Sequence, residues 1–317
     1  MTLGRGREAR RDAAYAALMG GDLAGRLGAV YALVELADEW LGEVSLPVGV
    51  RRGHVQGVID RLCAYLRSPL NTAAADNGPA GESAGAQGRI QQAIVEDIHR
   101  RVQHPVASAE GASLAGAWSG FAFNFSGAVF VCTVNFTGSR WEHEVDFSDC
   151  IFMRDALFSC STFAGTANFA HSSYRALADF SESLYQDAAY FGGCTWGGAV
   201  NFSRCTFRAG AYFLGCRYGA DTVFTGCFFA GTVVMMYSAY HGAFTATGCT
   251  FAGMPTCALQ HTTVLLACAG ACSSRMRGLA AAHGVAAPSF RGRSLRGRLI
   301  LAAPRTWRTP FLPTQFL

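Results

Sequence analysis

Cysteine is the residue type in this chain most suited to chemistry, because thiolates bind metal ions and act as nucleophiles. The sequence contains 12 cysteines but no Cys-x-x-Cys pair. Cys268 and Cys272 form an isolated Cys-x-x-x-Cys, with no second pair at the spacing of a zinc site. A disulfide framework is typical of short secreted chains, whereas this chain has 317 residues. We therefore expect free thiols and no metal site.

Histidine next to carboxylates could provide general acid–base catalysis, and the stretch WEHEVDF contains such a group. Glu142, His143 and Glu144 are consecutive, however, so on a strand or corner their side chains point in different directions. His171 and His241 have no carboxylate at a matching position. The sequence contains no phosphate-binding loop, His-Glu-x-x-His or dinucleotide fingerprint. We predict no catalytic residues, no metal ligands, no cofactor and no enzymatic activity.

A sequence repeat determines which elements carry these side chains. From Phe125 onward, aromatic residues recur at alternating spacings of five and six, and 22 of the 24 positions in the two resulting columns are aromatic. The first column is Phe125, Phe136, Phe147, Phe158, Phe169, Phe180, Phe191, Phe202, Phe213, Phe224, Met235 and Ala246. The second is Phe130, Trp141, Phe152, Phe163, Tyr174, Tyr185, Trp196, Phe207, Tyr218, Phe229, Tyr240 and Phe251. Each column thus has a period of 11, and a fixed period is typical of repeat architectures.

Small residues stand two positions before the aromatic residues, a spacing that places both on the same face of a strand. The small residues before the first column are Val134, Val145, Ala156, Ala167, Ala178, Ala189, Val200, Ala211, Thr222 and Val233. Those before the second are Ala128, Ser139, Cys150, Ser161, Ser172, Ser183, Cys194, Cys205, Cys216, Cys227, Ser238 and Cys249. Because serine and cysteine interchange there, we interpret these cysteines as small buried filling. Polar residues between the paired positions, such as Asn135, are expected to face water.

A period of 11 also occurs in helical supercoils. Residues five apart on an α-helix are separated by about 140°, so the two columns would lie on nearly opposite sides. Repeated glycines such as Gly138 and the scarcity of leucine, glutamate and lysine also disfavour helix. We predict a β-solenoid instead. Each short strand buries one large and one small residue, and glycine adopts the backbone conformations that the corners require.

The pattern small–Asn/Asp–Phe in ANFAH (167–171), ADFSE (178–182) and VNFSR (200–204) resembles the pentapeptide-repeat family. The alternating spacings are similar to its phenylalanine-rich branch, and the resemblance covers residues 125–256. It implies a mainly β fold, a right-handed, four-sided β-helix with 22 residues per coil and about six coils over the twelve copies.

Residues 22 apart would then stack at about 4.8 Å. Phe180, Phe202 and Phe224 would form one aromatic ladder. Because Met235, Phe244 and Ala246 depart from the pattern, we expect the last coil or two to be irregular.

The regions before the repeats are predicted to be mainly helical. Apolar residues recur at helical spacing in 23–41 and 54–67, so we predict an α-helical region over 1–67. It resembles the helical segment that precedes the repeats in actinobacterial-type members of the family. Residues 68–88 lack periodicity and predict a flexible linker. A helix over 89–103, with a lead-in to 124, should cap the first coil and cover its strand edge.

The tail, residues 257–317, is predicted to be basic and poorly ordered. All 26 basic residues of the chain are arginines, and the tail has eight of them and no acid. Contact with nucleic acid or an anionic membrane through this tail is the alternative interpretation. We find neither a signal peptide nor a stretch of apolar residues long enough to cross a bilayer, and expect a cytoplasmic protein.

Two functions are compatible with these features. We favour a non-catalytic scaffold or protein-interaction module whose partner is an unidentified protein, or a second copy in a homodimer, with no small-molecule substrate. The alternative comes from the family resemblance, because some members mimic DNA and bind DNA gyrase or topoisomerase. Such mimicry needs a strongly negative surface. Residues 121–256 contain six arginines and nine acidic residues, a weak negative balance.

Overall fold

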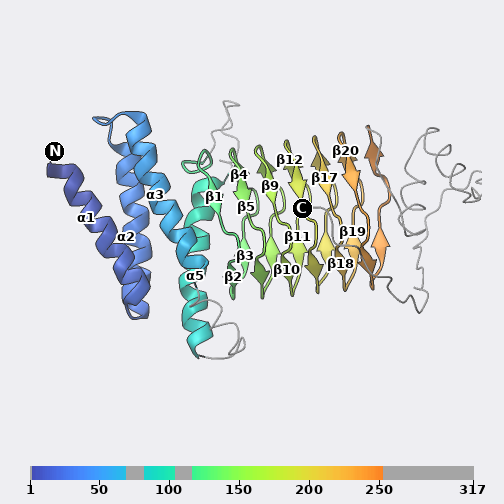
Figure 1. The fold of residues 1–317 in the computed structure, drawn as a ribbon, viewed down its shortest axis with the longest axis horizontal. Coiled ribbons are helices and arrows are strands. Elements are labelled where there is room, and N and C mark those ends of the chain that lie inside the picture. Colours follow the sequence, from blue (N-terminus) through green and yellow to red (C-terminus); the bar gives the residue numbers. More distant parts are fainter. Residues whose placement is uncertain (1, 69–81, 104–115, 253–317) are drawn as a thin grey trace, which may run out of the picture.

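The structure is a computed structural model that describes residues 2–68, 82–103 and 116–252. In these residues, a group of helices is followed by a stack of two-residue strands, and Figure 1 shows the helices continuing the stack at its N-terminal end. The helices are α1 (Thr2–Gly20), α2 (Leu23–Gly42), α3 (Val48–Leu66) and α5 (Glu82–Val102). The basic tail expected over 257–317 lies outside the described residues, as does most of the expected linker.

Local sequence explains where the helices begin. The side chain of Asp22 accepts a hydrogen bond from the Gly25 N–H at 2.7 Å and caps α2. Pro47 precedes α3, a position where its missing N–H costs nothing. The helix expected from residue 89 begins at Glu82 instead, so residues 82–88, which we assigned to the linker, are helical.

The strands form four parallel sheets. The first sheet contains β1 (Phe123–Asn124), β5 (Val145–Asp146), β9 (Ala167–Asn168), β13 (Ala189–Tyr190), β17 (Ala211–Tyr212) and β21 (Val233–Val234). The second contains β2 (Val129–Phe130), β6 (Ile151–Phe152), β10 (Ser173–Tyr174), β14 (Thr195–Trp196), β18 (Arg217–Tyr218) and β22 (Ala239–Tyr240). The third contains β3 (Val134–Asn135), β7 (Ala156–Leu157), β11 (Ala178–Asp179), β15 (Val200–Asn201), β19 (Thr222–Val223) and β23 (Phe244–Thr245). The fourth contains β4 (Arg140–Trp141), β8 (Thr162–Phe163), β12 (Leu184–Tyr185), β16 (Thr206–Phe207), β20 (Phe228–Phe229) and β24 (Thr250–Phe251).

Each strand from β1 to β20 pairs with the strand four positions further along the chain, so one coil passes through all four sheets in turn. Ala178 is paired with Val200, for example, which holds the equivalent position in the next coil. The Cys150 N–H likewise donates to the Ser172 hydroxyl across an interval of 22 residues. The predicted β-solenoid of about six coils is therefore confirmed, together with the predicted length of one coil, while the handedness of its winding stays a prediction.

Aromatic ladders fill the solenoid. Phe180, Phe202 and Phe224 are at most 1% exposed, and their ring centroids stack at 5.0 and 4.8 Å in successive coils. The other column aromatics from Phe125 to Phe229 are also buried, as predicted. Each buried ring contributes about 1.5–3 kcal/mol before its entropy cost. The core therefore runs without interruption along the rod.

Backbone geometry at the corners also follows the period of 11. Positive φ occurs at every eleventh residue from 127 to 248, at Gly127, Gly138, Asp149, Cys160, His171, Glu182, Gly193, Arg204, Gly215, Gly226, Tyr237 and Gly248. Glycine adopts this left-handed conformation without a Cβ penalty, whereas the other residues do not. Asn and Asp side chains next to the buried aromatics accept from the N–H two residues later, as Asn201 does from Ser203 at 2.9 Å.

The last coil keeps its register, contrary to our expectation that it would be irregular. Thr222 pairs with Phe244 and Phe228 pairs with Thr250. Phe244 occupies the position of a small residue, and its ring lies 5.8 Å from that of Phe224 in the coil before. Phe244 is large where the repeat has a small residue, and Ala246 is small where the repeat has an aromatic ring. This exchange of sizes keeps the core filled.

Two helices cover the first coil. The side-chain amide of Gln91 on α5 donates to the Val129 carbonyl at 2.7 Å and accepts from the Val131 N–H at 2.8 Å. Gln56 on α3 bonds in the same way to both backbone groups of Ala122, at 2.8 and 3.2 Å. Each glutamine replaces the hydrogen bonds of a neighbouring strand, so these edge groups are satisfied without further pairing.

Candidate interaction surface and cavity

The column cysteines are buried hydrogen-bond donors. The Cys194 thiol donates to the Phe169 carbonyl at 3.1 Å, and the Ser183 hydroxyl donates to the Phe158 carbonyl at 2.8 Å. The same bond to a carbonyl 25 residues earlier is made by Cys150, Ser161, Ser172, Cys205, Cys216, Cys227, Ser238 and Cys249. Cysteine and serine therefore interchange because both are small and both donate, which adds a second requirement to the size that we inferred.

Burial raises the pKa of the column cysteines Cys150, Cys194, Cys205 and Cys216. The nine cysteines in the described part of the chain are free. Burial raises the pKa of Cys63 and of Cys132 to about 12, so both stay protonated near neutral pH. The hydrogen bond between Cys227 and Cys249 raises the pKa of Cys227 and lowers that of Cys249. Cys268 and Cys272 lie outside the described residues.

The histidine and carboxylate candidates are exposed on the surface. Glu142 accepts from the Arg140 guanidinium at 3.1 Å, while its neighbours His143 and Glu144 are exposed. His171 occupies a corner with φ of 61°. The Nδ1 of His241 lies 3.3 Å from the Tyr218 carbonyl oxygen.

No group of three or more histidine, cysteine or acidic side chains that could hold a metal ion occurs within residues 2–68, 82–103 and 116–252. In the same residues, no helix has the length and apolar character needed to cross a membrane.

An apolar patch lies on the outer face of the first sheet, over β13, β17 and β21. Its outward strand positions change along the rod from Asn124, Asp146 and Asn168 to Tyr190, Tyr212 and Val234. Leu214 and Met236 follow two residues after Tyr212 and Val234, just beyond the ends of β17 and β21. We call Tyr190, Tyr212, Leu214, Val234, Met236 and Tyr237 the tyrosine patch.

Three residues of the tyrosine patch are exposed, and the other three are half-buried. Tyr190, Leu214 and Tyr237 are 39%, 45% and 62% exposed. The rings of Tyr190 and Tyr212 stack along the rod with centroids 5.0 Å apart and planes 9° from parallel. The Tyr212 side chain lies over Gly210, where an added Cβ would meet its hydroxyl and ring atoms at 2.5–2.7 Å. The absence of a side chain at Gly210 thus leaves room for the Tyr212 ring to pack against the sheet.

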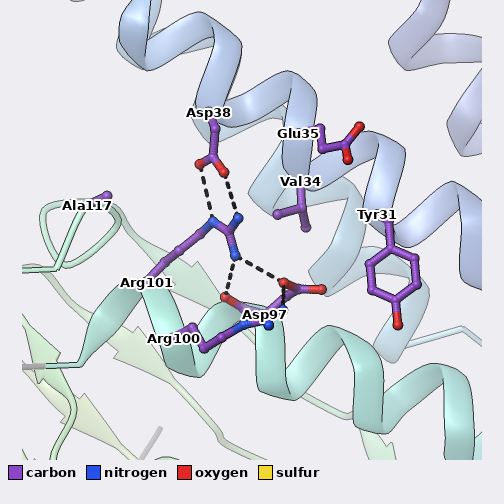
Figure 2. Close-up of a pocket in the computed structure, with 8 residues that line it drawn as sticks. All are labelled: Tyr31, Val34, Glu35, Asp38, Asp97, Arg100, Arg101 and Ala117. Atoms are coloured by element: carbon purple, nitrogen blue, oxygen red, sulfur yellow. Dashed lines mark hydrogen bonds and ion pairs between the residues drawn. The ribbon is translucent and has the colours of Figure 1, made fainter.

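A cavity of about 590 Å³ opens between α2 and α5 (Figure 2). It is lined by Tyr31, Val34, Glu35, Asp38, Asp97, Arg100, Arg101 and Ala117. Arg101 binds both carboxylate oxygens of Asp38, at 3.2 and 2.6 Å, and the Asp97 Oδ1 at 3.0 Å. Burial acts to lower the pKa of Arg101, but the hydrogen bond to Asp38 and the other acid contacts raise it overall.

We had predicted neither feature. A comparison of residues 22 apart would have revealed the tyrosine patch, because tyrosine replaces asparagine and aspartate along a single column. No sequence pattern predicts the cavity, since Asp38 and Arg101 are 63 residues apart and meet only through helix packing.

Comparison with known proteins addresses the repeats directly. Residues 186–227 match the family model described as pentapeptide repeats (9 copies). No curated protein and no solved structure matches the chain. The phenylalanine-rich branch and the actinobacterial type stay predictions. Together with the four stacked parallel sheets, the match supports the pentapeptide-repeat family for the solenoid of this chain.

Proposed function

We propose that this protein is a non-catalytic interaction module that contacts a protein partner through the tyrosine patch. The observation that carries the proposal is the replacement of Asn168 by Tyr190 and Tyr212 at the same outward position of successive coils. Contiguous apolar surface of this kind marks interaction sites in soluble proteins. Tyrosine is also among the residues enriched at the energetic centres of interfaces.

The rod supports such a role because it holds the patch in place before a partner arrives. The rings of Phe191 and Phe213 are buried directly beneath it and stack at 5.0 Å. The backbone is also bonded from coil to coil, as in the Phe191 N–H to the Tyr212 carbonyl at 2.7 Å. A surface that needs no ordering on binding avoids part of the entropy cost of association.

Substitutions taken from the same columns test this proposal with little risk to folding. Tyr190→Asn, Tyr212→Asp and Leu214→Ser introduce the residue types found at Asn168, Asp146 and Ser148. We expect affinity capture followed by mass spectrometry to recover partners with the native chain and to lose them with this triple variant. Val223→Asn is the matched control, because it makes the same kind of change on the third sheet, next to Asn201.

An identical set of captured proteins for the native chain and the triple variant would overturn the proposal. Light scattering on the purified chains identifies the case in which the partner is a second copy. A dimer that becomes monomeric in the triple variant, but not in Val223→Asn, is the expected result for a homodimer formed through the tyrosine patch.

We do not propose DNA mimicry. Eight of the nine acidic residues in 121–256 precede residue 188, and only Asp221 follows it. Three of the six arginines, Arg204, Arg208 and Arg217, lie in that later half, so a continuous negative surface is lacking there. Inhibition of gyrase supercoiling by the purified protein would restore this alternative.

A further inference from the structure

We propose that the cavity between α2 and α5 binds a cationic group on an apolar stem, a guanidinium or primary ammonium group that donates to Asp97 Oδ2. The starting point is an imbalance at Asp97, which is only 2% exposed. Its Oδ1 accepts from both Arg100 and Arg101, whereas its Oδ2 has no hydrogen-bond partner among the described residues. Figure 2 shows Oδ2 turned away from both arginines, on the side of Tyr31.

A buried carboxylate oxygen without a donor is costly, because it has lost its water and gained nothing in exchange. The arginines already present do not remove this cost. Arg101 uses Nε and Nη2 on Asp38, and its Nη1 is shared between Oδ1 and the main-chain carbonyl of Asp97. Neither arginine therefore donates to Asp97 Oδ2, and a ligand in the cavity can supply the missing donor.

The charge of the cavity also favours a cation. Its lining contains three carboxylates, those of Glu35, Asp38 and Asp97, and two guanidinium groups. Asp38 and Asp97 are paired with arginines, but Glu35 is exposed and forms no salt bridge with a described residue. The net formal charge of the lining is thus negative, which attracts cations and repels carboxylates and phosphates.

The apolar part of the lining accounts for the stem. Ala117 is exposed, Val34 lines the cavity but is only 2% exposed, and Tyr31 is 50% exposed. An aromatic face attracts a guanidinium or ammonium group, and alkyl walls hold the methylene groups that carry it. Arginine and lysine side chains have this chemistry, and so do small alkylguanidinium and alkylammonium ions.

Titration of the full-length protein with small probes tests the site, with nuclear magnetic resonance of Tyr31, Val34 and Ala117 as the readout. We expect butylguanidinium and butylammonium to cause saturable shifts, and butanol and butyrate to cause none. Equal binding of butanol, or no saturable shift with either cation, would overturn the proposal.

Variants separate the charge of the site from its shape. Asp97→Asn should weaken butylguanidinium binding roughly ten- to a hundredfold, as expected for a lost bond to a buried charge. Glu35→Gln should weaken it about two- to fivefold, as expected for an exposed ion pair. Glu96→Gln is the control, because Glu96 is exposed on α5 beside Asp97 and does not line the cavity.

Because Asp97→Asn could disturb the packing of α2 on α5, a second variant keeps all charges. Ala117→Trp places a ring in the cavity from an exposed turn, and we expect it to abolish the shifts of Tyr31 and Val34. Unchanged binding in Ala117→Trp, or in an Asp97→Asn variant with native circular dichroism, would contradict the proposal.

The two sources of the cation are distinguished by a peptide. The blocked tripeptide Gly-Arg-Gly presents the guanidinium on a main chain, as a protein partner would. If it binds within a fewfold of butylguanidinium, the site accepts a side chain. If only the free cation binds, the site accepts a small molecule, and both results support the same chemistry at Asp97.

Discussion

The thiol of Cys205 donates a hydrogen bond to the main-chain carbonyl of Phe180, 25 residues earlier, at 3.0 Å. Cys205 is fully buried, so water cannot replace this donor. The bond therefore ties the side chain that fills one coil to the backbone of the coil before it.

Substitution of Cys205 separates size from hydrogen bonding. Cys205→Ser keeps a small donor, as at Ser183, and should change the free energy of unfolding by less than about 1 kcal/mol. Cys205→Ala and Cys205→Val leave the Phe180 carbonyl without its donor and should each cost about 1–3 kcal/mol. Urea denaturation measures all three, and equal stability of the serine and alanine variants would show that size alone matters.

Removal of an aromatic ring from the ladder should be severe. Phe202 stacks on Phe180 and Phe224 and is fully buried. Phe202→Ala should lower the free energy of unfolding by about 3–5 kcal/mol, because the stacked neighbours cannot collapse into the space. Phe228→Ser is the comparison, since Phe228 faces outward and is 38% exposed. Similar urea midpoints for the two variants would contradict the ladder as the source of stability.

The glutamine that closes the first coil should also matter. Gln91→Leu leaves the Val129 carbonyl and the Val131 N–H without their partner on α5, which should cost about 1–3 kcal/mol in unfolding free energy. Gln92→Leu alters the next residue, whose amide bonds only to Glu96 on the exposed face, and should be nearly neutral. Hydrogen exchange at Val131 provides a local readout: faster exchange is expected in Gln91→Leu alone.

One substitution is expected to have opposite effects at two glycines. Gly215 has φ of +68° and an added Cβ would meet nothing within 4 Å, so Gly215→Ala isolates the conformational cost of about 1–2 kcal/mol. Gly28, inside α2, also has open space, and Gly28→Ala should stabilise the protein by about 0.5–1 kcal/mol. Thermal denaturation compares them, and a shift in the same direction for both would refute the conformational explanation.

Alkaline pH should destabilise the protein through its buried thiols. Burial raises the pKa of Cys63 from 9.0 to about 12 in the folded chain, so the unfolded chain releases this proton first as pH rises. The unfolded state then binds fewer protons, and stability falls between about pH 9 and pH 12. Unfolding free energies measured along this range should decline less steeply in Cys63→Ala. An identical pH dependence in that variant would contradict the assignment.

The solenoid could be predicted from sequence because its core repeats at a fixed spacing. Phe180 and Phe202 were assigned to the interior correctly, since a side chain that stacks on its own equivalent recurs at the same position of each coil. The hydrogen bond of Cys205 was not predicted, because the repeat shows which side chains are buried but not which carbonyl groups they contact. Ala246 was misread as a defect, because its exchange with Phe244 becomes visible only in space.

Features outside the repeat were harder to predict. Residues 82–88 contain two glycines and lack an apolar stripe, so nothing local favours a helix there. Tertiary contacts stabilise it instead, as in the bond from Gln87 to the buried Tyr65 hydroxyl at 2.8 Å. The unpartnered oxygen of Asp97 likewise depends on how α2 and α5 pack, which composition and spacing do not encode.

Each coil presents the same backbone donors and acceptors to the next coil, so the solenoid can be lengthened or shortened by whole coils. Deletion or duplication of one whole coil between β5 and β20 would join equivalent backbone positions and recreate the same contacts. The helices at the N-terminal end would be unaffected, since Gln56 and Gln91 touch only the first coil. The distance between the two ends of this molecule can thus change in steps of about 4.8 Å without redesign of either.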